Sequence, residues 1–368
     1  MNYWNYIRVE ELLALQGGID GDESKLTNDE VVFITVHQVY ELWFKLALRE
    51  IVRARDIFRQ NPVPDVEMSA AVRSFKRIST IFEMAVAHFK VVETLTTRDY
   101  LEFRDQLIPA SGFQSAQIRE LEVMLGLEDA VRVPLGKQKS FLEALQGEGG
   151  KESSALLRVQ KRLADKPTLK EAVYEWLTRT PIYGGAHSEE GTVQFLRSFL
   201  DAHRKDAEAR MQRAMTAAGS VVDAGEIRAR YEREIKNAES FLFAEDDPAI
   251  DPETKRRRRD VRAAAIFLES YRELPRLAWA REVVDSVLEM EQAMILWRQR
   301  HARMVERVIG RRVGTGGSSG VDYLDETALK YRVFHDLWGV RALLLRAPIL
   351  PPVEHEDTYR FRVEDRST

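Results

Sequence analysis

A histidine and a glycine-rich loop stand next to each other near the C-terminal end of the chain. His301 lies on an apolar helical stripe, and residues 314–320 read Gly-Thr-Gly-Gly-Ser-Ser-Gly. A histidine on such a stripe is most often a core residue, but a neutral imidazole there can also hold heme iron from one side. Four glycines give a loop freedom to move or to approach a ligand closely. Arg298, Arg303 and Arg307 also lie nearby and could meet heme propionates. The loop and these arginines strengthen the ligand-site interpretation against the commoner core histidine. The other members of the stripe are Met294, Trp297, Met304, Val305 and Val308.

A second group of residues has the spacing of one helix face near the N-terminus. Phe33, His37, Tyr40 and Phe44 follow one another at helical intervals. A phenylalanine can pack on a planar ligand, and a neutral imidazole can accept an N–H or act as a base. The face holds no second histidine or carboxylate at metal-ligand spacing, which argues against a bare metal site. The pattern fits a pocket wall, and a buried core histidine remains the simpler alternative.

A third segment combines a tyrosine and an arginine with a chain break. Tyr100 and Arg104 are one helical turn apart, and Pro109 with Gly112 ends the helix just beyond them. A guanidinium fork suits a carboxylate, and a tyrosine hydroxyl can bond to the same oxygens. An internal ion pair of Arg104 with a nearby acid is the competing interpretation. The segment predicts a carboxylate site if the helix faces a cavity.

The elements that must position these residues are predicted to be almost all helices. Apolar periodicity indicates an all-α helical bundle with a ligand pocket between helices. We divide the chain into N-terminal helices (1–126), an accessory helical region (127–253), a segment with the His301 helix, loop and final helix (254–347), and a tail (348–368), all in one integrated domain. Helices are expected at 7–16, 29–60, 67–95, 96–106, 114–126, 168–178, 190–217, 224–242, 254–272, 276–310 and 326–345.

Composition narrows the classes of function. The 368 residues carry a formal net charge of −4, which gives no reason to expect nucleic acid as a partner. No apolar run approaches the roughly 20 residues that cross a bilayer, and no signal peptide is visible, so we expect no membrane partner and a cytoplasmic location. The chain has no cysteine, which excludes disulfides, thiolate heme ligation and iron–sulfur clusters.

Taken together, the three segments closely resemble the tryptophan 2,3-dioxygenase family. Residues 33–45 read Phe-Ile-Thr-Val-His-Gln-Val-Tyr-Glu-Leu-Trp-Phe-Lys, and residues 103–115 read Phe-Arg-Asp-Gln-Leu-Ile-Pro-Ala-Ser-Gly-Phe-Gln-Ser. The third is the His301 helix with the glycine loop and Tyr-Leu that follow it. Three long motifs in the family's order are highly specific. The resemblance covers roughly 1–126 and 254–340 and is weak over 127–250.

The resemblance implies a role for each residue of the site. His301 would be the proximal ligand of a non-covalent heme b, one per subunit. His37 would lie on the opposite side, near the indole N–H of the substrate, and Phe33 would pack on the indole ring. Arg104 and Tyr100 would hold the substrate carboxylate.

Four further residues take roles from the same resemblance. Thr315 on the loop would contact the substrate's carboxylate and ammonium groups. Ser111, which we count with His37 as catalytic, and Gly112 would lie beside the heme edge and the oxygen. Tyr3 matches a tyrosine that the family lends to the neighbouring subunit's pocket, which implies a homotetramer.

The implied activity is a heme-dependent dioxygenase reaction. Both atoms of O2 would enter the indole C2–C3 bond of L-tryptophan and give N-formyl-L-kynurenine, the first step of tryptophan degradation by the kynurenine pathway. A related heme-dependent monooxygenase, acting on an aromatic amino acid in a biosynthetic pathway, is the alternative because it would keep His301 and Arg104. A non-catalytic heme sensor is a remote third.

Overall fold

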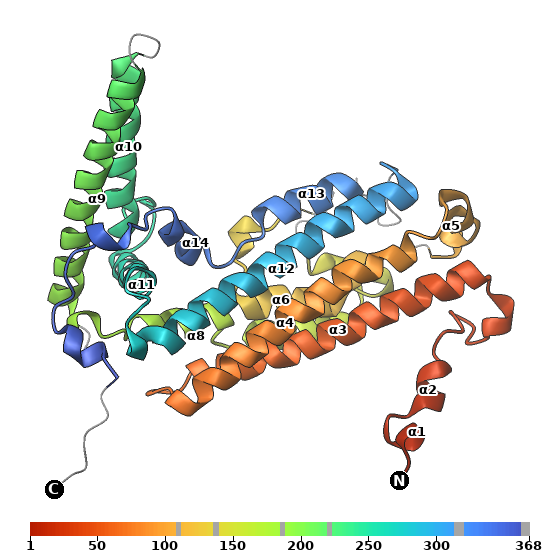
Figure 1. Cartoon of the computed structure of the whole chain (residues 1–368). Coiled ribbons are helices and arrows are strands. Elements are labelled where there is room, and N and C mark those ends of the chain that lie inside the picture. The colour runs from red at the N-terminus through yellow and green to blue at the C-terminus, as the bar shows by residue number, and fades with distance from the viewer. Residues whose placement is uncertain (108–111, 135–139, 185–187, 219–222, 313–319, 362–368) are drawn as a thin grey trace, which may run out of the picture. The chain divides into compact units, whose positions relative to one another are not determined.

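The described part of the chain is helical. The computed structural model describes residues 1–107, 112–134, 140–184, 188–218, 223–312 and 320–361, and it contains no strand over these ranges. Figure 1 shows the helices in chain order. The predicted all-α class is therefore confirmed. The domain boundaries drawn from the sequence stay predictions.

The described helices belong to two compact units, each made of separate stretches of the chain. Unit 1 comprises Met1–Arg55, Arg73–Leu169 and Glu289–Val333. Unit 2 comprises Asp56–Val72, Lys170–Leu288 and Phe334–Thr368. All three segments singled out in the sequence fall in unit 1.

Three long helices form the core of unit 1. They are α3 (Asn28–Phe58), α4 (Asp65–Val92) and α12 (Ala278–Ile309), each of which has its larger part in this unit. Thr27 accepts a hydrogen bond from the backbone N–H of Glu30 at 3.2 Å, which confirms the predicted start of α3. The Tyr40 hydroxyl donates to the Ala85 carbonyl at 2.9 Å and ties α3 to α4. Aromatic side chains fill the space between these helices because large apolar groups gain most from burial.

Shorter elements surround these helices in unit 1. The capping box of Thr96 and Asp99 starts α5, and Ser115 caps α6. Val123 of α6 packs against Leu156 and Val159 of α7. The helices are α1 (Tyr3–Tyr6), α2 (Val9–Leu13), α5 (Thr97–Arg104), α6 (Ala116–Leu125), α7 (Ser154–Ala164) and α13 (Gly320–Lys330). The 3-10 turns are η1 (Glu23–Lys25), η2 (Asp105–Leu107), η3 (Gly112–Gln114), η4 (Asp129–Val131), η5 (Glu143–Leu145) and η6 (Glu148–Gly150).

The single helix expected over 326–345 is wrong. The chain forms α13, breaks after Lys330, and starts again as α14 (His335–Arg341). In the break, the Arg332 N–H bonds to the Lys330 carbonyl and the Val333 N–H bonds to the buried Glu291 carboxylate. The Glu291 carboxylate on α12 thus accepts the Val333 N–H in place of a backbone carbonyl of the preceding helical turn. No proline or glycine marks the break in the sequence.

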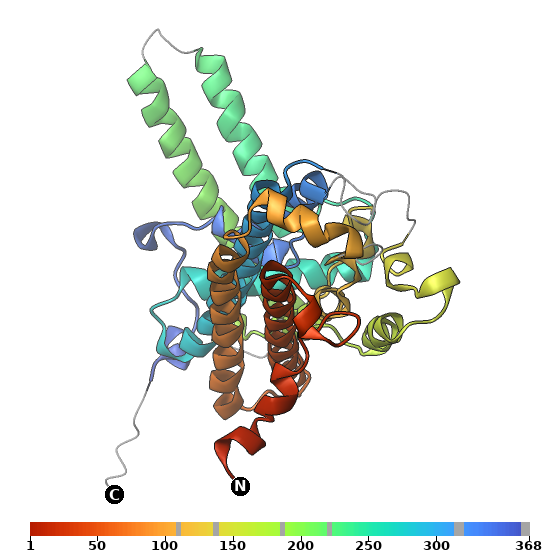
Figure 2. The same ribbon diagram turned by 90° about the vertical axis from the view of Figure 1, so that its right-hand side faces the viewer.

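Unit 2 contains an antiparallel hairpin of two long helices, α9 (Glu189–Ala218) and α10 (Ala224–Leu242), seen in both views (Figures 1 and 2). Ala207, Ile227 and Tyr231 form its apolar contact, and Arg210 bonds to Glu234 at 2.6 Å. The remaining elements of this unit are α8 (Leu169–Leu177, beyond its first residue), α11 (Pro252–Ser270), α14, η7 (Ile182–Gly184), η8 (Pro275–Leu277), η9 (Ala347–Ile349) and η10 (Glu356–Tyr359).

By length and composition alone, one described helix could also cross a membrane, and that helix is α3. The same test is passed by core helices of soluble proteins. The aromatic face of α3 packs on protein side chains of α4, so the test is weak evidence for a membrane span.

Candidate active site

The first part of the site is the inward face of α3. The rings of Phe33 and His37 lie 4.1 Å apart, and His37 Nδ1 is 2.7 Å from the Phe33 carbonyl oxygen. Because a carbonyl can only accept, Nδ1 carries the proton, and Nε2 of the neutral ring is left as an acceptor. Solvent reaches the His37 side chain, yet surrounding protein lowers its pKa by desolvation.

The second part is α5, whose Tyr100 and Arg104 meet this face. The Phe33 ring lies 5.9 Å from the Tyr100 ring and 5.5 Å from the Phe103 ring. Burial raises the pKa of Tyr100, and the positive charge of the neighbouring Arg104 guanidinium opposes that rise. The structure therefore joins the first two sequence segments into one cluster. It places a phenol and a guanidinium together beside the two rings of α3, the pairing that carboxylate binding requires.

His301 on α12 supplies the third part. Its ring is parallel to that of Phe89 at 5.5 Å, with 3° between the planes, and lies 5.4 Å from Trp297. Burial, together with the positive charges of His37 and Arg298, lowers the pKa of His301 to about 4. The imidazole is thus neutral at physiological pH. The helices α3 and α12, which carry the two histidines, pack together where the Phe44 ring lies 5.5 Å from the Trp297 ring, and the positive charge of His37 acts on His301.

The residues around His301 fit a heme better than a bare metal ion. A neutral imidazole is the form that binds metal, and among the described residues nothing hydrogen-bonds to the His301 ring. No cluster of three or more histidine, cysteine or acidic side chains exists in the described ranges, so a bare ion would have too few ligands. The buried indole N–H of Trp297 also has no acceptor there. One neutral nitrogen among aromatic rings is the donor set that a porphyrin iron accepts.

A buried ion network next to His301 went unnoticed in the sequence. Glu122 of α6 is 2% exposed and pairs with Arg119 (3.1 Å), Arg132 (2.7 Å) and Arg298 (2.8 Å). The three guanidiniums hold the pKa of Glu122 at about 2 against the burial that would raise it. Arg119 also donates to the Tyr323 hydroxyl at 3.2 Å. The network therefore links α6 to α13 and to α12 one turn from His301. The one feature of the sequence that indicates this network is the presence of charged residues among the apolar residues of α6.

Arg298 and Arg303, which both lie on α12 near His301, differ in burial and in their ion-pair partners. The sequence offers both, together with Arg307, as partners for heme propionates. Arg298 is largely buried and bound to Glu122, so its positive charge stays beside His301. Arg303 is exposed and pairs with Asp325 at 2.5 Å on the solvent side. Of these two, only Arg298 keeps its charge beside His301, and there it already pairs with Glu122.

Four predicted site residues remain. The described ones show no contact with the cluster of Phe33, His37, Tyr100 and Arg104, and the others lie outside the described residues. Tyr3 on α1 is 74% exposed and has no recorded contact with the cluster within its own chain. Gly112 begins η3 and is exposed, with open space where a Cβ would lie. Ser111 and Thr315 fall outside the described residues. The roles predicted for all of these residues stay predictions.

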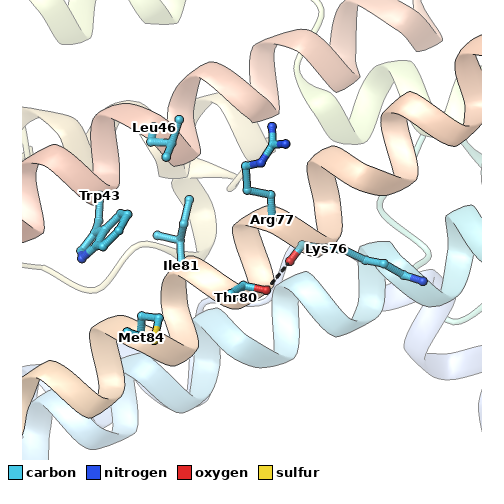
Figure 3. Close-up of a pocket in the computed structure, with 7 residues that line it drawn as sticks. All are labelled: Trp43, Leu46, Lys76, Arg77, Thr80, Ile81 and Met84. Carbon is cyan, nitrogen blue, oxygen red and sulfur yellow. Dashed lines mark hydrogen bonds between the residues drawn. The ribbon is translucent and has the colours of Figure 1, made fainter. Parts of the chain in front are cut away.

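A groove between α3 and α4 is separate from this cluster (Figure 3). It has a volume of about 420 Å³, and the Thr80 hydroxyl on its floor donates to the Lys76 carbonyl at 3.0 Å. Its lining contains no residue of the predicted site. The lining residues are Trp43, Leu46, Lys76, Arg77, Thr80, Ile81 and Met84.

Comparison with known proteins gives one family along nearly the whole chain. The family model for tryptophan 2,3-dioxygenase matches residues 1–344, including the middle region where the resemblance was weak. Tryptophan 2,3-dioxygenase of Sorangium cellulosum is 64% identical over 365 residues, covering 99% of this chain and 88% of its own. Tryptophan 2,3-dioxygenase 2 of Ralstonia nicotianae is 54% identical over 364 residues (99% and 98%), and the Xenopus laevis enzyme is 34% identical over 372 (99% and 88%). The dioxygenase is thereby favoured over the monooxygenase alternative, and the chain belongs to the tryptophan 2,3-dioxygenase family.

Proposed function

We propose that this chain is a heme-dependent L-tryptophan 2,3-dioxygenase, with His301 as the ligand of heme b iron. It would insert both atoms of O2 into the indole C2–C3 bond and release N-formyl-L-kynurenine. The observation that supports this most directly is the clustering of Phe33, His37, Tyr100 and Arg104 near the neutral His301. These residues come from three helices. Together they would supply a site for the carboxylate, a ring and an acceptor for the indole, and a neutral ligand for the iron.

The protein's own residues would orient the substrate. The Arg104 guanidinium and the Tyr100 hydroxyl would hold the carboxylate, while Phe33 packs on the indole ring. The free acceptor, Nε2 of His37, would take the indole N–H and fix which edge of the ring faces the reacting centre. Ferrous heme, when bound, supplies the binding and activation of O2.

A neutral His37 is central to this arrangement. An imidazolium would present a second N–H instead of an acceptor, and it would repel the indole N–H. Desolvation lowers the pKa of His37 and therefore keeps the acceptor form present at neutral pH. His37 could also hold the indole proton at Nε2 if that proton leaves during ring opening.

Isotope labelling tests the reaction. The purified chain, supplied with hemin and a reductant, is given L-tryptophan and ¹⁸O2, and the product is weighed by mass spectrometry. N-Formyl-L-kynurenine with two labelled oxygens supports the proposal. A hydroxylated product with one labelled oxygen would instead identify a monooxygenase.

Absorbance tests the iron ligand. His301→Ala should abolish the Soret band that the wild-type chain acquires with hemin. His335→Ala is the matched control, because His335 is exposed on α14 in unit 2. An unchanged Soret band in His301→Ala would refute the assignment of His301.

The exposed N-terminal arm supports assembly into a homotetramer. Tyr3, Tyr6 and Leu13 of α1 and α2 are all more than half exposed, which is costly for apolar groups unless another surface covers them. By the resemblance, that surface is the pocket of a neighbouring subunit, which Tyr3 completes. Light scattering tests the mass of the assembly.

Subunit mixing tests the lending of Tyr3. Tyr3→Ala and Arg104→Ala chains should each be weakly active. Assemblies formed by unfolding and refolding the two together should regain activity, because some pockets then receive both intact residues. If mixed tetramers regained no activity, Tyr3 would lie outside the site.

We further propose a cytoplasmic location, which a fluorescent fusion would test.

A further inference from the structure

One acidic residue joins the helix of His37 to the turn that precedes α6. Glu41 lies one helical turn after His37 on α3. The Ser115 hydroxyl donates to one carboxylate oxygen of Glu41 at 2.6 Å, and the Gln117 side-chain amide donates to the other at 2.8 Å. The same amide also reaches the Glu41 backbone carbonyl at 2.7 Å. Three hydrogen bonds thus converge on one residue.

These hydrogen bonds fix residues 112–115, the turn between Gly112 and the start of α6. The Ser115 N–H bonds to the Gly112 carbonyl at 3.2 Å, and the Ser115 side chain also accepts from the Ile118 N–H at the start of α6. Ser115 therefore connects Gly112, α6 and Glu41. Both carboxylate oxygens of Glu41 accept a hydrogen bond from this turn, so Glu41 anchors the turn to α3.

Glu41 also acts on His37 through its charge. The Glu41 carboxylate raises the pKa of His37, opposing the effect of desolvation. Its field therefore reaches the imidazole one turn away. The same side chain therefore links α3, which carries His37, to the turn that begins at Gly112, which the resemblance places beside the heme edge.

We propose that Glu41 is a positioning residue, which fixes the 112–115 turn relative to His37 and thereby aligns the two sides of the reacting centre. This inference rests on the proposed function. The carboxylate does not touch substrate, which Arg104, Tyr100 and Phe33 hold. Loss of Glu41 therefore misplaces the turn and lowers kcat, while affinity for L-tryptophan is kept.

Steady-state kinetics with three variants tests the proposal. Glu41→Ala should lower kcat on the order of tenfold to a hundredfold, the size expected when a group near the chemistry shifts by about 1 Å, with KM changed less than about threefold. Glu41→Gln keeps an oxygen that can accept from Ser115 and should recover part of kcat. Glu83→Ala is the matched control, since it removes an exposed glutamate from α4.

Hydrogen–deuterium exchange of the apoprotein gives a readout independent of heme and turnover. Amides of residues 112–118 should exchange faster in Glu41→Ala than in wild type, and at the wild-type rate in Glu83→Ala. If Glu41→Ala does not fold, Gln117→Leu removes two of the three bonds without altering α3 and should show the same local change with a smaller loss of kcat.

The outcomes separate the two proposals. A wild-type chain without dioxygenase activity would overturn the proposed function but leave the exchange result standing. Folded, active Glu41→Ala with wild-type kcat and wild-type exchange over 112–118 would overturn the role of Glu41. A rise in KM with kcat unchanged would also overturn it, because Glu41 would then act on substrate binding.

Discussion

Replacement of Arg104 by lysine tests how the site recognises its substrate. The guanidinium lies at the end of α5, where its charge lowers the pKa of the Tyr100 phenol, and the Tyr100 ring lies 5.9 Å from that of Phe33. A planar fork can give a carboxylate two parallel hydrogen bonds, and an ammonium group gives it one point charge. Arg104→Lys therefore keeps the positive charge, removes one charge-assisted hydrogen bond and loses the planar arrangement of two parallel donors.

The expected loss follows from that single bond. A hydrogen bond to a charged group contributes about 1.5–3 kcal/mol, which corresponds to roughly a 10- to 160-fold weaker affinity for L-tryptophan. Tyr100→Phe removes a second donor to the same carboxylate. Because Tyr100 and Arg104 also bond to each other, the two losses should not add, and a coupling of at least about 0.5 kcal/mol is expected in the double variant.

Binding titrations with L-tryptophan and with tryptamine measure this effect. Tryptamine has the indole and ammonium groups but no carboxylate, so Arg104→Lys should weaken L-tryptophan selectively. Arg98→Lys, an exposed arginine on the same helix, is the control and should change neither affinity. If Arg104→Lys weakened tryptamine as much as L-tryptophan, the guanidinium would not be the carboxylate site.

Two further predictions concern stability. Glu122→Gln should lower the free energy of unfolding by about 3–5 kcal/mol at pH 7, because it leaves buried guanidiniums without their carboxylate. Since the folded-state pKa of Glu122 is about 2 and its ordinary value is 4.5, its contribution is present above pH 4.5 and declines as pH falls toward 2. Urea unfolding should therefore show the gap between variant and wild type narrowing below pH 4.5, and a constant gap would contradict this. Gly339→Ala should cost about 1–3 kcal/mol, because the new Cβ clashes with the Phe241 ring. Phe241→Leu should relieve that cost in thermal unfolding, and additive losses would refute the clash.

Helix positions could be predicted from the sequence because they depend on local periodicity and caps. The starts of α3 and α5 lie at Thr27 and Thr96, whose side chains satisfy N–H groups within the same turn. The break after Lys330 could not be predicted in this way. Its cause is the Glu291 carboxylate, which is 42 residues away along the chain and accepts the Val333 N–H.

The sequence by itself determined the helical class and, through its motifs, the family, and it supplied the candidate residues of the site. Residue types at helical spacing placed Phe33 and His37 on one face and Tyr100 and Arg104 on another, because that spacing is a property of a single helix. Only the tertiary structure decided that these faces meet each other near His301, and that Glu41 and Glu122 tie the helices together. Such contacts join residues far apart in the chain, and they depend on burial and on paired charges that no local pattern encodes.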